Sequence, residues 1–471
     1  MLQDRNKQMA QRIAEKVAQR GGRVFYVGGL VRDKLLGREN KDVDIEVHGV
    51  TPQVLEGILD SLGERTEMGA SFGVYGLKHY ELDIAMPRKE QATGRGHRDF
   101  AVFVDPFLGT QKAAQRRDFT INALMEDVLT GEIVDHFGGQ EDLKRGMVRH
   151  VNDVSFAEDP LRVLRAAQFA ARFGFCVAEE TISLCARMDL TTLASERILG
   201  ELEKALLKAP RPSVFFAVLR QMGQLGCWFP EVEALIGIPQ EPQFHPEGDV
   251  WNHTMLVLDQ AAKLRQQAKE PLGLMLAALC HDLGKQTAIQ NDNGRIRALG
   301  HEEAGIGLAE GFLSRITNEK RLHRYVANMV ELHMRPNILA AQHSSRKSFC
   351  KLFDRSLCPE DLILLAKADA LGRGIQQDYT PTEGYLQEKL AAFHEIMSRP
   401  FVQGADLIAV GFAPGKDFSE ALAYAHKMRL AGVKKEDALR QTAAFLQKER
   451  SEHHADTERN EYSYPRKAQR D

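Results

Sequence analysis

The periodicity of apolar and polar residues changes near residue 155 of the chain. Before it, short runs rich in Val, Ile, Phe and Tyr end at glycines or polar residues, which is typical of strands. After it, apolar residues recur at steps of three and four, which predicts amphipathic helices. The expected strands are RVFYVGG, DVDIEVHG, GVYGLKHY, ELDIAM, FAVFVD and EIVDHF. The expected helices include VRDKLLG, EDPLRVLRAAQFAARFG, SVFFAVLRQMGQLG, LGLMLAALCHDLG, RLHRYVANMVELH and DLILLAKADALG.

This change of periodicity predicts an α+β head followed by an all-α neck and body. The chain has 471 residues, which at about 150 residues per domain indicates about three domains. We expect the head over residues 1–155, the neck over 156–225, a second helical domain over 226–395 and a helical C-terminal region over 396–447. Residues 448–471 contain no Leu, Ile, Val, Met or Phe and six charges of each sign, so we predict a disordered tail.

Composition restricts the cellular compartment and the binding partners that we expect for this protein. Lys and Arg number 62 against 65 Asp and Glu, so contact with nucleic acid would depend on local basic patches. The six cysteines include no CxxC pair and are typical of reduced thiols in an intracellular protein. The charged N-terminus is unlike a signal peptide, and the longest apolar stretch, residues 272–280, is far shorter than the ~18 residues of a membrane span. We therefore expect a soluble, cytoplasmic protein with no membrane contact.

The head contains the most specific motif, YVGGLVRDKLLGRENKDVDIEV. Gly28 and Gly29 end a strand and open a helix, where backbone N–H groups can approach a phosphate. Asp42 and Asp44 alternate along the next strand and share one face, a pairing that suits Mg²⁺ bound together with a substrate phosphate. Asp83, in ELDIAM, can supply a third carboxylate from a neighbouring strand.

Each part of this motif has a simpler structural explanation when it is taken alone. A Gly-Gly pair is common in turns, and Asp-x-Asp is commonly a solvated strand face. Their occurrence together within 17 residues favours a site for a nucleotide and a metal.

With these residues in place, the head resembles the polymerase-beta-like nucleotidyltransferases, and within them the class II tRNA nucleotidyltransferases, the CCA-adding enzymes. RRDFTINAL (116–124) resembles the second signature of that family, and EDPLRVLR (158–165) resembles its base-selecting element. The resemblance covers roughly residues 22–390. It implies Mg²⁺-dependent addition or repair of the 3′-terminal CCA of tRNA from CTP and ATP, by a monomer or homodimer.

The resemblance also implies roles for single residues. Metal binding and catalysis fall to Asp42, Asp44 and Asp83; contact with the nucleotide triphosphate falls to Gly28, Gly29, Arg32 and Arg117; base selection falls to Asp159, Arg162 and Arg165. Physical chemistry supports these roles, because the planar guanidinium binds phosphate bidentately, and an Asp–Arg pair matches the base edges of C and A.

Alternatives to these roles remain open. Arg116 and Arg117 could instead form an ion pair with Asp118. Asp159 could be the N-cap of a helix that begins at Pro160, with Arg162, Arg165, Gln168 and Arg172 forming a solvated stripe along it. Many relatives carry arginine where this chain has Gln168. The stretch RKEQATGRGHRD (88–99) lies where the family has a flexible loop that distinguishes CCA addition from CC addition.

The helical body carries a second pattern: His253, the adjacent pair His281 and Asp282, and the distant Asp369. It resembles the HD phosphohydrolase domain, which implies a divalent transition metal such as Ni²⁺ or Mn²⁺ and a hydrolase active on 2′,3′-cyclic nucleotides or phosphate monoesters. Imidazole and carboxylate ligands suit such an ion, which lowers the pKa of bound water. His301 and His333 resemble the extra histidines that some HD domains use for substrate or a second metal. The simpler explanation is that each histidine is a hydrogen-bonded core residue.

We therefore expect a CCA-adding tRNA nucleotidyltransferase with a possible second, hydrolytic activity. The sequence leaves open a poly(A) polymerase, although such enzymes usually have a basic C-terminal extension and lack the HD ligands. It also leaves open addition of CC or A alone, and a phosphohydrolase with an inactive head, against which the intact Asp42 and Asp44 argue. A non-enzymatic RNA-binding module would not need paired carboxylates.

Overall fold

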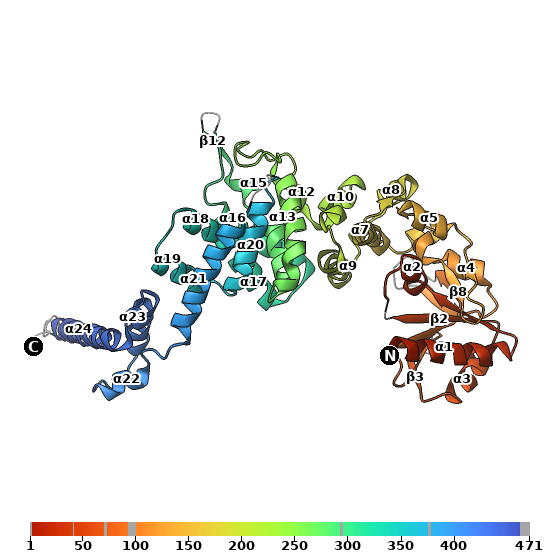
Figure 1. Ribbon diagram of the computed structural model, residues 1–471, viewed down its shortest axis with the longest axis horizontal. Helices are drawn as coiled ribbons and strands as arrows, with labels where there is room; N and C mark the ends of the chain where they lie inside the picture. The colour runs from red at the N-terminus through yellow and green to blue at the C-terminus, as the bar shows by residue number, and fades with distance from the viewer. Residues whose placement is uncertain are drawn as a thin grey trace, which may run out of the picture. The chain divides into compact units, whose positions relative to one another are not determined.

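The computed structural model describes residues 2–40, 42–69, 73–92, 100–292, 295–374 and 378–461 (Figure 1). The chain divides into two compact units. The first contains residues 1–234 together with 312–318, and the second contains residues 235–311 together with the chain from 319 onward. The predicted head and neck therefore belong to one unit. The predicted fold class, an α+β head followed by helical regions, is confirmed.

The head is built on one seven-stranded sheet with the order β3-β4-β5-β2-β1-β8-β9. Its neighbours pair antiparallel except β2 and β5, which are parallel. All the strands that the apolar runs predict are present, most of them in this sheet. Its strands are β1 (Arg23–Val27), β2 (Val43–His48), β3 (Arg65–Gly69), β4 (Val74–Leu77), β5 (Leu82–Ala85), β8 (Met125–Asp127) and β9 (Ile133–Val134).

Helices α1 (Leu2–Ala18) and α3 (Pro52–Asp60) lie side by side on one face of this sheet (Figure 1). Met9, Ile13 and Val17 of α1 recur at helical spacing and are buried in the same core as Val43, Ile45 and Val47 of β2. Because side chains alternate along a strand, Asp44 and Glu46 of β2 point to the opposite face. The core helices thus leave the other face of the sheet for polar chemistry.

Several shorter elements complete the head. The segment expected to be a flexible loop begins as a strand, because β6 pairs antiparallel with β7 from Arg88 opposite Val104 to Ala92 opposite Phe100. Residues 93–99, the rest of that segment, lie outside the described residues. The remaining elements of the head are α2 (Gly29–Leu35), β6 (Arg88–Ala92), β7 (Phe100–Val104), α4 (Thr110–Gln115), η2 (Thr120–Asn122), α5 (Gly139–Arg145), β10 (Met147–Val148) and α6 (Asp153–Ala157).

The predicted neck is helical and packs around α7 (Leu161–Phe173). Val163, Leu164, Ala167 and Ala171 of this helix are buried at three- and four-residue steps, against α9 and α10. The other elements here are β11 (Cys176–Val177), α8 (Glu179–Cys185), α9 (Ser195–Lys208), α10 (Ser213–Gln221), α11 (Leu225–Trp228) and α12 (Pro230–Glu233).

The second unit is a helical bundle centred on α14 (Pro271–Cys280). Every residue of α14 from Gly273 to Cys280 is buried, and α13, α17 and α20 surround it. A helix that is apolar all round belongs in the middle of a bundle. Its other elements are α13 (Val250–Leu264), η3 (Arg265–Gln267), α15 (Lys285–Ala288), β12 (Gln290–Asp292), β13 (Arg295–Arg297), α16 (His301–Ile316, whose end belongs to the first unit), α17 (Lys320–Leu332), α18 (Arg335–Ala341), α19 (Arg346–Arg355), α20 (Pro359–Leu371) and α21 (Thr380–Ser398).

The C-terminal region has a small core of its own, formed by α22 (Gly404–Ala409), α23 (Phe418–Leu430) and α24 (Lys435–Glu461). The prediction of a disordered tail over 448–471 is wrong as far as residue 461, because α24 continues to that point. The tail contains several Glu and Arg residues and two Lys, which favour helix without any apolar stripe. Residues 462–471 lie outside the described residues.

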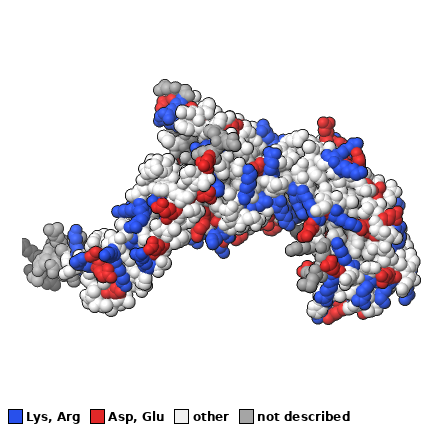
Figure 2. All heavy atoms as spheres, in the orientation of Figure 1, with Lys and Arg blue, Asp and Glu red and all other residues white. Residues whose placement is uncertain are grey.

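Surface properties agree with the composition. Figure 2 shows that both signs of charge are spread over the visible face of each unit. All six cysteines are free thiols. Among the described helices, none combines the length and the apolar content needed to cross a bilayer.

Candidate active site and candidate metal centre

The Gly-Gly turn of the head lies where the sequence predicts it. β1 ends at Val27, Gly28 has a φ of 66°, and α2 begins at Gly29. A Cβ atom on Gly28 would lie 3.1 Å from Nη1 of Arg117. The Arg117 guanidinium therefore lies against bare backbone at the start of a helix, an arrangement that suits a phosphate.

The predicted carboxylates meet at one edge of a cavity. Asp44 of β2 is directly opposite Asp83 of β5, and both line a cavity of about 390 Å³ together with Glu46, Arg116 and Arg117. Burial raises the pKa of Asp44, and the nearby charge of Asp83 raises it further, whereas Arg117 opposes the shift. Such crowding of like charges is what a bound cation would relieve.

Asp42 stands apart from this pair. It precedes β2, which begins at Val43, and its side chain is exposed, whereas Asp44 is half-buried. Among the described residues, the oxygens of Asp42, Asp44 and Asp83 do not all come within 4.8 Å of one another. The expected sharing of one strand face by Asp42 and Asp44 is therefore not observed within β2, and the residue that sheet register places opposite Asp44 is Asp83.

Glu46 is a functional candidate that the sequence analysis missed. Its carboxylate lies 2.8 Å from Nε2 of His48 and accepts a hydrogen bond of 3.4 Å from Arg117. Burial alone would raise the pKa of Glu46, but these two neighbours lower it below its usual value. The sequence does contain a pattern that points to Glu46, because this residue continues the alternation of acidic residues begun by Asp42 and Asp44.

Arg32 lies in the interior and does not line the cavity. Its guanidinium donates to Asp33 at 2.8 Å and to Asn122 at 2.5 Å, and it stacks on the rings of Phe169 and Phe173. Arg32 thus fixes the start of α2 to the neck helix α7. Its contact with a triphosphate stays a prediction.

The base-selecting residues form ion pairs and hydrogen bonds within the unit. Asp159 accepts hydrogen bonds from Arg197 at 2.8 and 3.1 Å and one from the backbone N–H of Leu161. Arg162 donates to the backbone carbonyls of Ser155 and Arg116. The prediction that Asp159 is the N-cap is wrong, because α7 begins at Leu161 and Pro160 is its N-cap, although the Asp159 carboxylate accepts from the N–H of Leu161.

Asp118 pairs with Arg165, which donates to its carboxylate at 2.6 and 2.8 Å. Arg117 instead forms its ion pair with Glu46. Burial alone would raise the pKa of Asp118, but Arg165 and Asn122 lower it below its usual value. Gln168, on the stripe expected to be solvated, is 1% exposed, so this part of the stripe faces the interior.

The second unit brings its predicted ligands together in one buried cluster. His253 comes from α13, His281 and Asp282 follow α14, and Asp369 comes from α20; all are at most 3% exposed. Their atoms lie close, with His253 Nε2 at 3.1 Å from Asp369 and His281 Nε2 at 3.2 Å from Asp282.

His301 and His333 join this cluster on the other side of Asp282. The Asp282 Oδ1 atom lies 3.3 Å from Nε2 of His301 and 3.8 Å from Nε2 of His333. A Cβ atom on Gly284 would collide with the carbonyl oxygen of His301, so this glycine permits the close approach of α16. The ligating atoms of these six residues form two groups, each within 4.8 Å: His253, His281 and Asp369, and Asp282, His301 and His333; a third group of this kind joins His253 to His245 and Glu247.

Backbone carbonyls hold three of these imidazoles in one orientation. His281, His301 and His333 each donate from Nδ1 to the carbonyl three residues earlier, at 2.7 to 2.8 Å. Their Nε2 atoms therefore keep a lone pair and face the cluster. Burial also lowers the pKa of His333 to about 3, which keeps this imidazole in the neutral form that binds metals.

The cluster passes a test of fit for metal ions. Oδ1 of Asp282, Nε2 of His301, Nε2 of His333 and Oδ2 of Asp369 are buried and make no hydrogen bond in the described part of the chain, whereas Oδ2 of Asp282 faces the Lys285 ammonium at 2.7 Å. Buried polar atoms are normally hydrogen-bonded, so a converging set without bonds indicates a ligand. Mixed imidazole and carboxylate donors suit a divalent transition metal.

Further residues around the cluster escaped the sequence analysis. Glu247, 2% exposed at its side chain, lies 2.8 Å from Nδ1 of both His253 and His245. Lys285 Nζ lies 2.7 Å from Asp282, and Arg373 Nη2 lies 3.6 Å from Asp369. Lys285 and Arg373 each come one helical turn after a predicted ligand, which is a usable signal, whereas Glu247 precedes α13 in a loop without any regular spacing.

Comparisons with known proteins agree with both sites. The family described as Poly A polymerase head domain matches residues 24–149, and the family described as HD domain matches residues 250–374. The first range contains the Gly-Gly turn and the aspartates, and the second contains the histidine cluster.

The fold is shared with solved CCA-adding enzymes. The Bacillus stearothermophilus CCA-adding enzyme in complex with CTP is 22% identical, with a TM-score of 0.63 over 95% of this chain and 98% of that chain. The Thermotoga maritima CCA-adding enzyme complexed with tRNA is 21% identical, with a TM-score of 0.62 over 93% of this chain and 95% of that one.

Curated relatives are more similar in sequence. The multifunctional CCA protein of Nitrosococcus oceani is 38% identical over 80% of this chain and 92% of its own length. That of Alkalilimnicola ehrlichii is 35% identical over 88% of this chain and 98% of its own length. With a matching head, a matching HD domain and relatives of this similarity over most of its length, the chain belongs to the multifunctional CCA protein family.

Proposed function

We propose that the head adds nucleotides from CTP and ATP to the 3′ end of tRNA, building or repairing the terminal CCA. The observation that carries this proposal is the opposed pair Asp44 and Asp83 at a cavity that also contains Arg117. Membership of the multifunctional CCA protein family supports it, as do the names of the similar solved enzymes. In this reaction the 3′-oxygen bonds to the α-phosphorus, and pyrophosphate leaves.

The chain's own residues would divide the work in the head. Asp44 and Asp83, joined by Asp42 from the segment before β2, would hold Mg²⁺. When bound, Mg²⁺ supplies positive charge that stabilises the attacking and leaving oxygens. Arg117 and the backbone at Gly28 and Gly29 would bind the triphosphate, and Glu46 would keep the Arg117 guanidinium over that turn.

Base selection would fall to the neck residues Asp159, Arg162 and Arg165. Because each of these residues already has an internal partner, binding a base requires an exchange of contacts, for example Asp159 leaving Arg197 for the amino group of cytosine or adenine.

CCA addition is tested by incubating the protein with a tRNA that lacks CCA. CTP alone should add two residues, and ATP should then add one; long runs of A from ATP alone would instead support a poly(A) polymerase.

A second activity is favoured by the histidine cluster. We propose that the HD domain is a metal-dependent phosphohydrolase acting on 2′,3′-cyclic phosphates or phosphate monoesters. His253, His281 and Asp369 would hold one divalent ion such as Ni²⁺ or Mn²⁺, and Asp282, His301 and His333 a second. A bound ion lowers the pKa of its water to near neutrality. Glu247 would orient His253 through Nδ1, and Lys285 would face the phosphate.

The test of this second activity is hydrolysis of cytidine 2′,3′-cyclic phosphate by the full chain supplied with Ni²⁺ or Mn²⁺. We expect turnover that Asp282→Ala abolishes. A protein that binds these ions but hydrolyses neither cyclic phosphates nor monoesters would make the cluster a structural metal centre.

A further inference from the structure

One cavity opens on the histidine cluster, and a second cavity shares a wall with the first. The first, of about 410 Å³, contains His301 and Lys285 at its lining and so opens on the metal centre. The second, of about 700 Å³, is lined by Tyr379 and Tyr385 and by none of the candidate metal ligands. Both are lined by Met334, Ile338 and Arg373.

The first cavity combines a flat apolar surface with unused polar groups. Phe244 and Leu299 line it and are 47% and 72% exposed. Gln240, only 6% exposed, accepts a 2.7 Å hydrogen bond from Lys285, while its Nε2 has no hydrogen-bond partner in the described part of the chain. A phosphate near Lys285 and a base against Phe244 would satisfy both kinds of surface.

Arg373 lies in the wall that the two cavities share, and its guanidinium has an N–H donor that makes no hydrogen bond among the described residues. Its side chain is 29% exposed, Nη2 lies 3.6 Å from Asp369, and its buried Nε makes no hydrogen bond among the described residues. A buried donor left unpaired costs free energy, and the guanidinium fork fits phosphate oxygens. The arginine is thus placed to bind a second phosphate, between the two cavities.

The second cavity has the chemistry of a base-stacking site. Lys389, which lies outside the lining of the cavity, places Nζ 4.5 Å from the centre of the Tyr385 ring, and His343, which lines it, meets Tyr385 edge-on at 6.0 Å. The hydroxyl of Tyr379 donates to Asn337 at 2.6 Å, which fixes the neighbouring wall. Aromatic rings beside cations bind successive bases of single-stranded RNA.

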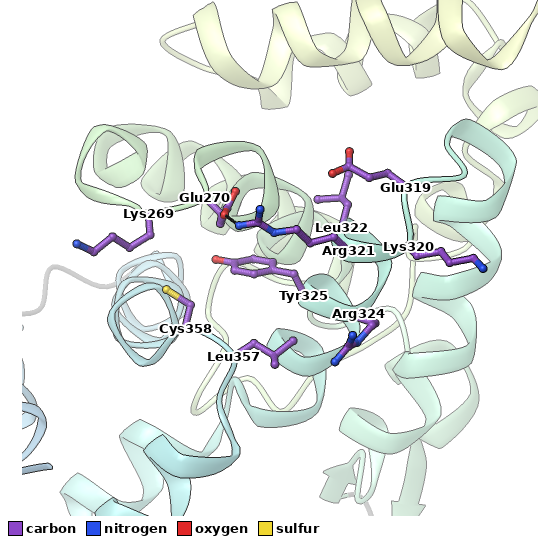
Figure 3. Close-up of a pocket in the computed structure, with 10 residues that line it drawn as sticks. All are labelled: Lys269, Glu270, Glu319, Lys320, Arg321, Leu322, Arg324, Tyr325, Leu357 and Cys358. Carbon is purple, nitrogen blue, oxygen red and sulfur yellow. Dashed lines mark hydrogen bonds and ion pairs between the residues drawn. The ribbon is translucent and has the colours of Figure 1, made fainter. Parts of the chain in front are cut away.

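Another cavity of the same unit also has a tyrosine among cations, but it lies apart from the first two cavities and serves as a comparison (Figure 3). It measures about 540 Å³ and is lined by Lys320, Arg321 and Arg324 with Tyr325. Figure 3 shows Arg321 paired with Glu270 across it, and the Tyr325 hydroxyl donates to the buried Asp361 at 2.6 Å. It shares no lining residue with the cavity that opens on the metal centre, so its cations carry no link to the hydrolytic site.

From these observations we propose that the HD site acts on the 3′ end of an RNA strand in preference to a free mononucleotide. The terminal nucleoside occupies the first cavity, the preceding nucleoside occupies the second, and Arg373 binds the phosphate that links them. This inference rests on the proposed hydrolase activity. In the reaction, water adds to the phosphorus of a 2′,3′-cyclic phosphate, one P–O bond breaks, and the proton of water passes to the released hydroxyl, leaving a phosphomonoester.

The test compares two substrates with the full chain in Ni²⁺ or Mn²⁺. One is cytidine 2′,3′-cyclic phosphate, and the other is the dinucleotide CpC ending in the same cyclic phosphate. We expect kcat/KM to be about tenfold higher for the dinucleotide, the size of effect that one stacked base provides. Equal values for the two substrates would overturn the inference and leave the hydrolase proposal standing. Hydrolysis of neither would overturn the hydrolase proposal itself.

Variants test whether the higher kcat/KM of the dinucleotide depends on the second cavity. Tyr385→Leu keeps the apolar volume but removes the ring, so the ratio of the two kcat/KM values should fall towards one; Tyr385→Phe should restore it. Arg373→Gln should lower the ratio as well. Arg324→Gln, in the cavity of Figure 3, is the matched control and should change neither value. A ratio that stays near ten in Tyr385→Leu, with its thermal unfolding unchanged, would contradict the placement.

Discussion

Asp44 and Asp83 lie opposite one another on β2 and β5, the only parallel pair of neighbouring strands among those described in the head sheet. Sheet register alone fixes this pairing, and the charge of Asp83 helps to raise the pKa of Asp44. Folding therefore keeps two like charges together at the edge of a cavity, at a cost that a bound cation removes.

The first prediction follows from this pair. Asp44→Asn should lower the rate of nucleotide addition to tRNA by about a thousandfold or more, because the metal loses a charged ligand in a site that works by electrostatic stabilisation. Asp83→Asn should lower it by a smaller factor. Both should fold normally by circular dichroism. Glu81→Gln, an exposed carboxylate that precedes β5, is the control. Near-normal CTP incorporation by Asp44→Asn would disprove the metal role.

The second prediction concerns the pairing of Asp159 with Arg197. Asp159→Ala should relax the preference for CTP and ATP over UTP and GTP, because a base contact is worth about 1–3 kcal/mol. Arg197→Ala breaks the same ion pair from its exposed side but leaves the carboxylate free to read the base. It should therefore keep the selectivity. Misincorporation is measured with each labelled nucleotide in turn. Equal loss of selectivity in the two variants would mean that Asp159 acts only through its ion pair.

The third prediction concerns the stability of the first unit and its dependence on pH. The pKa of Asp118 is below its usual value when the protein is folded, because Arg165 and Asn122 outweigh the effect of burial. A carboxyl group of this kind stabilises the folded state above its unfolded pKa, about 3.9, and this stabilisation is lost as the pH falls through the folded pKa.

Asp118→Asn should therefore lower the free energy of unfolding by about 3 kcal/mol at pH 7, the cost of breaking a mostly buried pair. Urea denaturation should show this difference shrinking below about pH 4. Glu141→Gln, which removes the exposed pair of Glu141 with Arg145, should cost at most about 0.5 kcal/mol. A difference between wild type and Asp118→Asn that stays constant from pH 7 to pH 3 would contradict the assignment.

The fourth prediction concerns the histidine cluster. Because the ligating atoms form two groups, the purified chain should bind about two transition-metal ions, measured by elemental analysis after dialysis. Asp282 faces both groups, because its Oδ2 lies 3.2 Å from Nε2 of His281 and its Oδ1 lies 3.3 Å from Nε2 of His301, so it is placed to bridge two ions. His333→Ala should therefore keep about one ion, and Asp282→Ala should lose most of both. Neither variant should change CCA addition, because the head aspartates lie in the other unit. His426→Ala, outside the cluster, serves as the control. Full metal content in Asp282→Ala would exclude it as the bridging ligand.

Much of this organisation could be predicted from local pattern. The strands around the Gly-Gly turn, the helices of the body and the order of the four HD ligands depend on residues near in sequence or on a recognisable series. The pairing of Asp44 with Asp83 could only be suggested, because the register between β2 and β5 depends on the whole sheet.

Other features depend on contacts between distant segments and left little local signal. The motif around Arg32 predicts a phosphate ligand. In the structure, contacts with Asn122 and Phe169, which are distant in sequence, hold the Arg32 side chain in the interior. Glu247 orients His253 from a loop that shows no periodicity. The helix that continues to residue 461 escaped notice because helical propensity without an apolar stripe resembles the composition of a disordered tail.

The most direct measurement of the proposed function is the sequence of the 3′ ends that the purified protein makes. tRNA transcripts that end before, within and after CCA are incubated with Mg²⁺ and all four nucleotides, and the products are sequenced. We predict that each incomplete transcript ends in CCA and that the complete one stays unchanged. Products that stop at CC, or that carry runs of A beyond the CCA position, would contradict the assignment of the head as a CCA-adding enzyme.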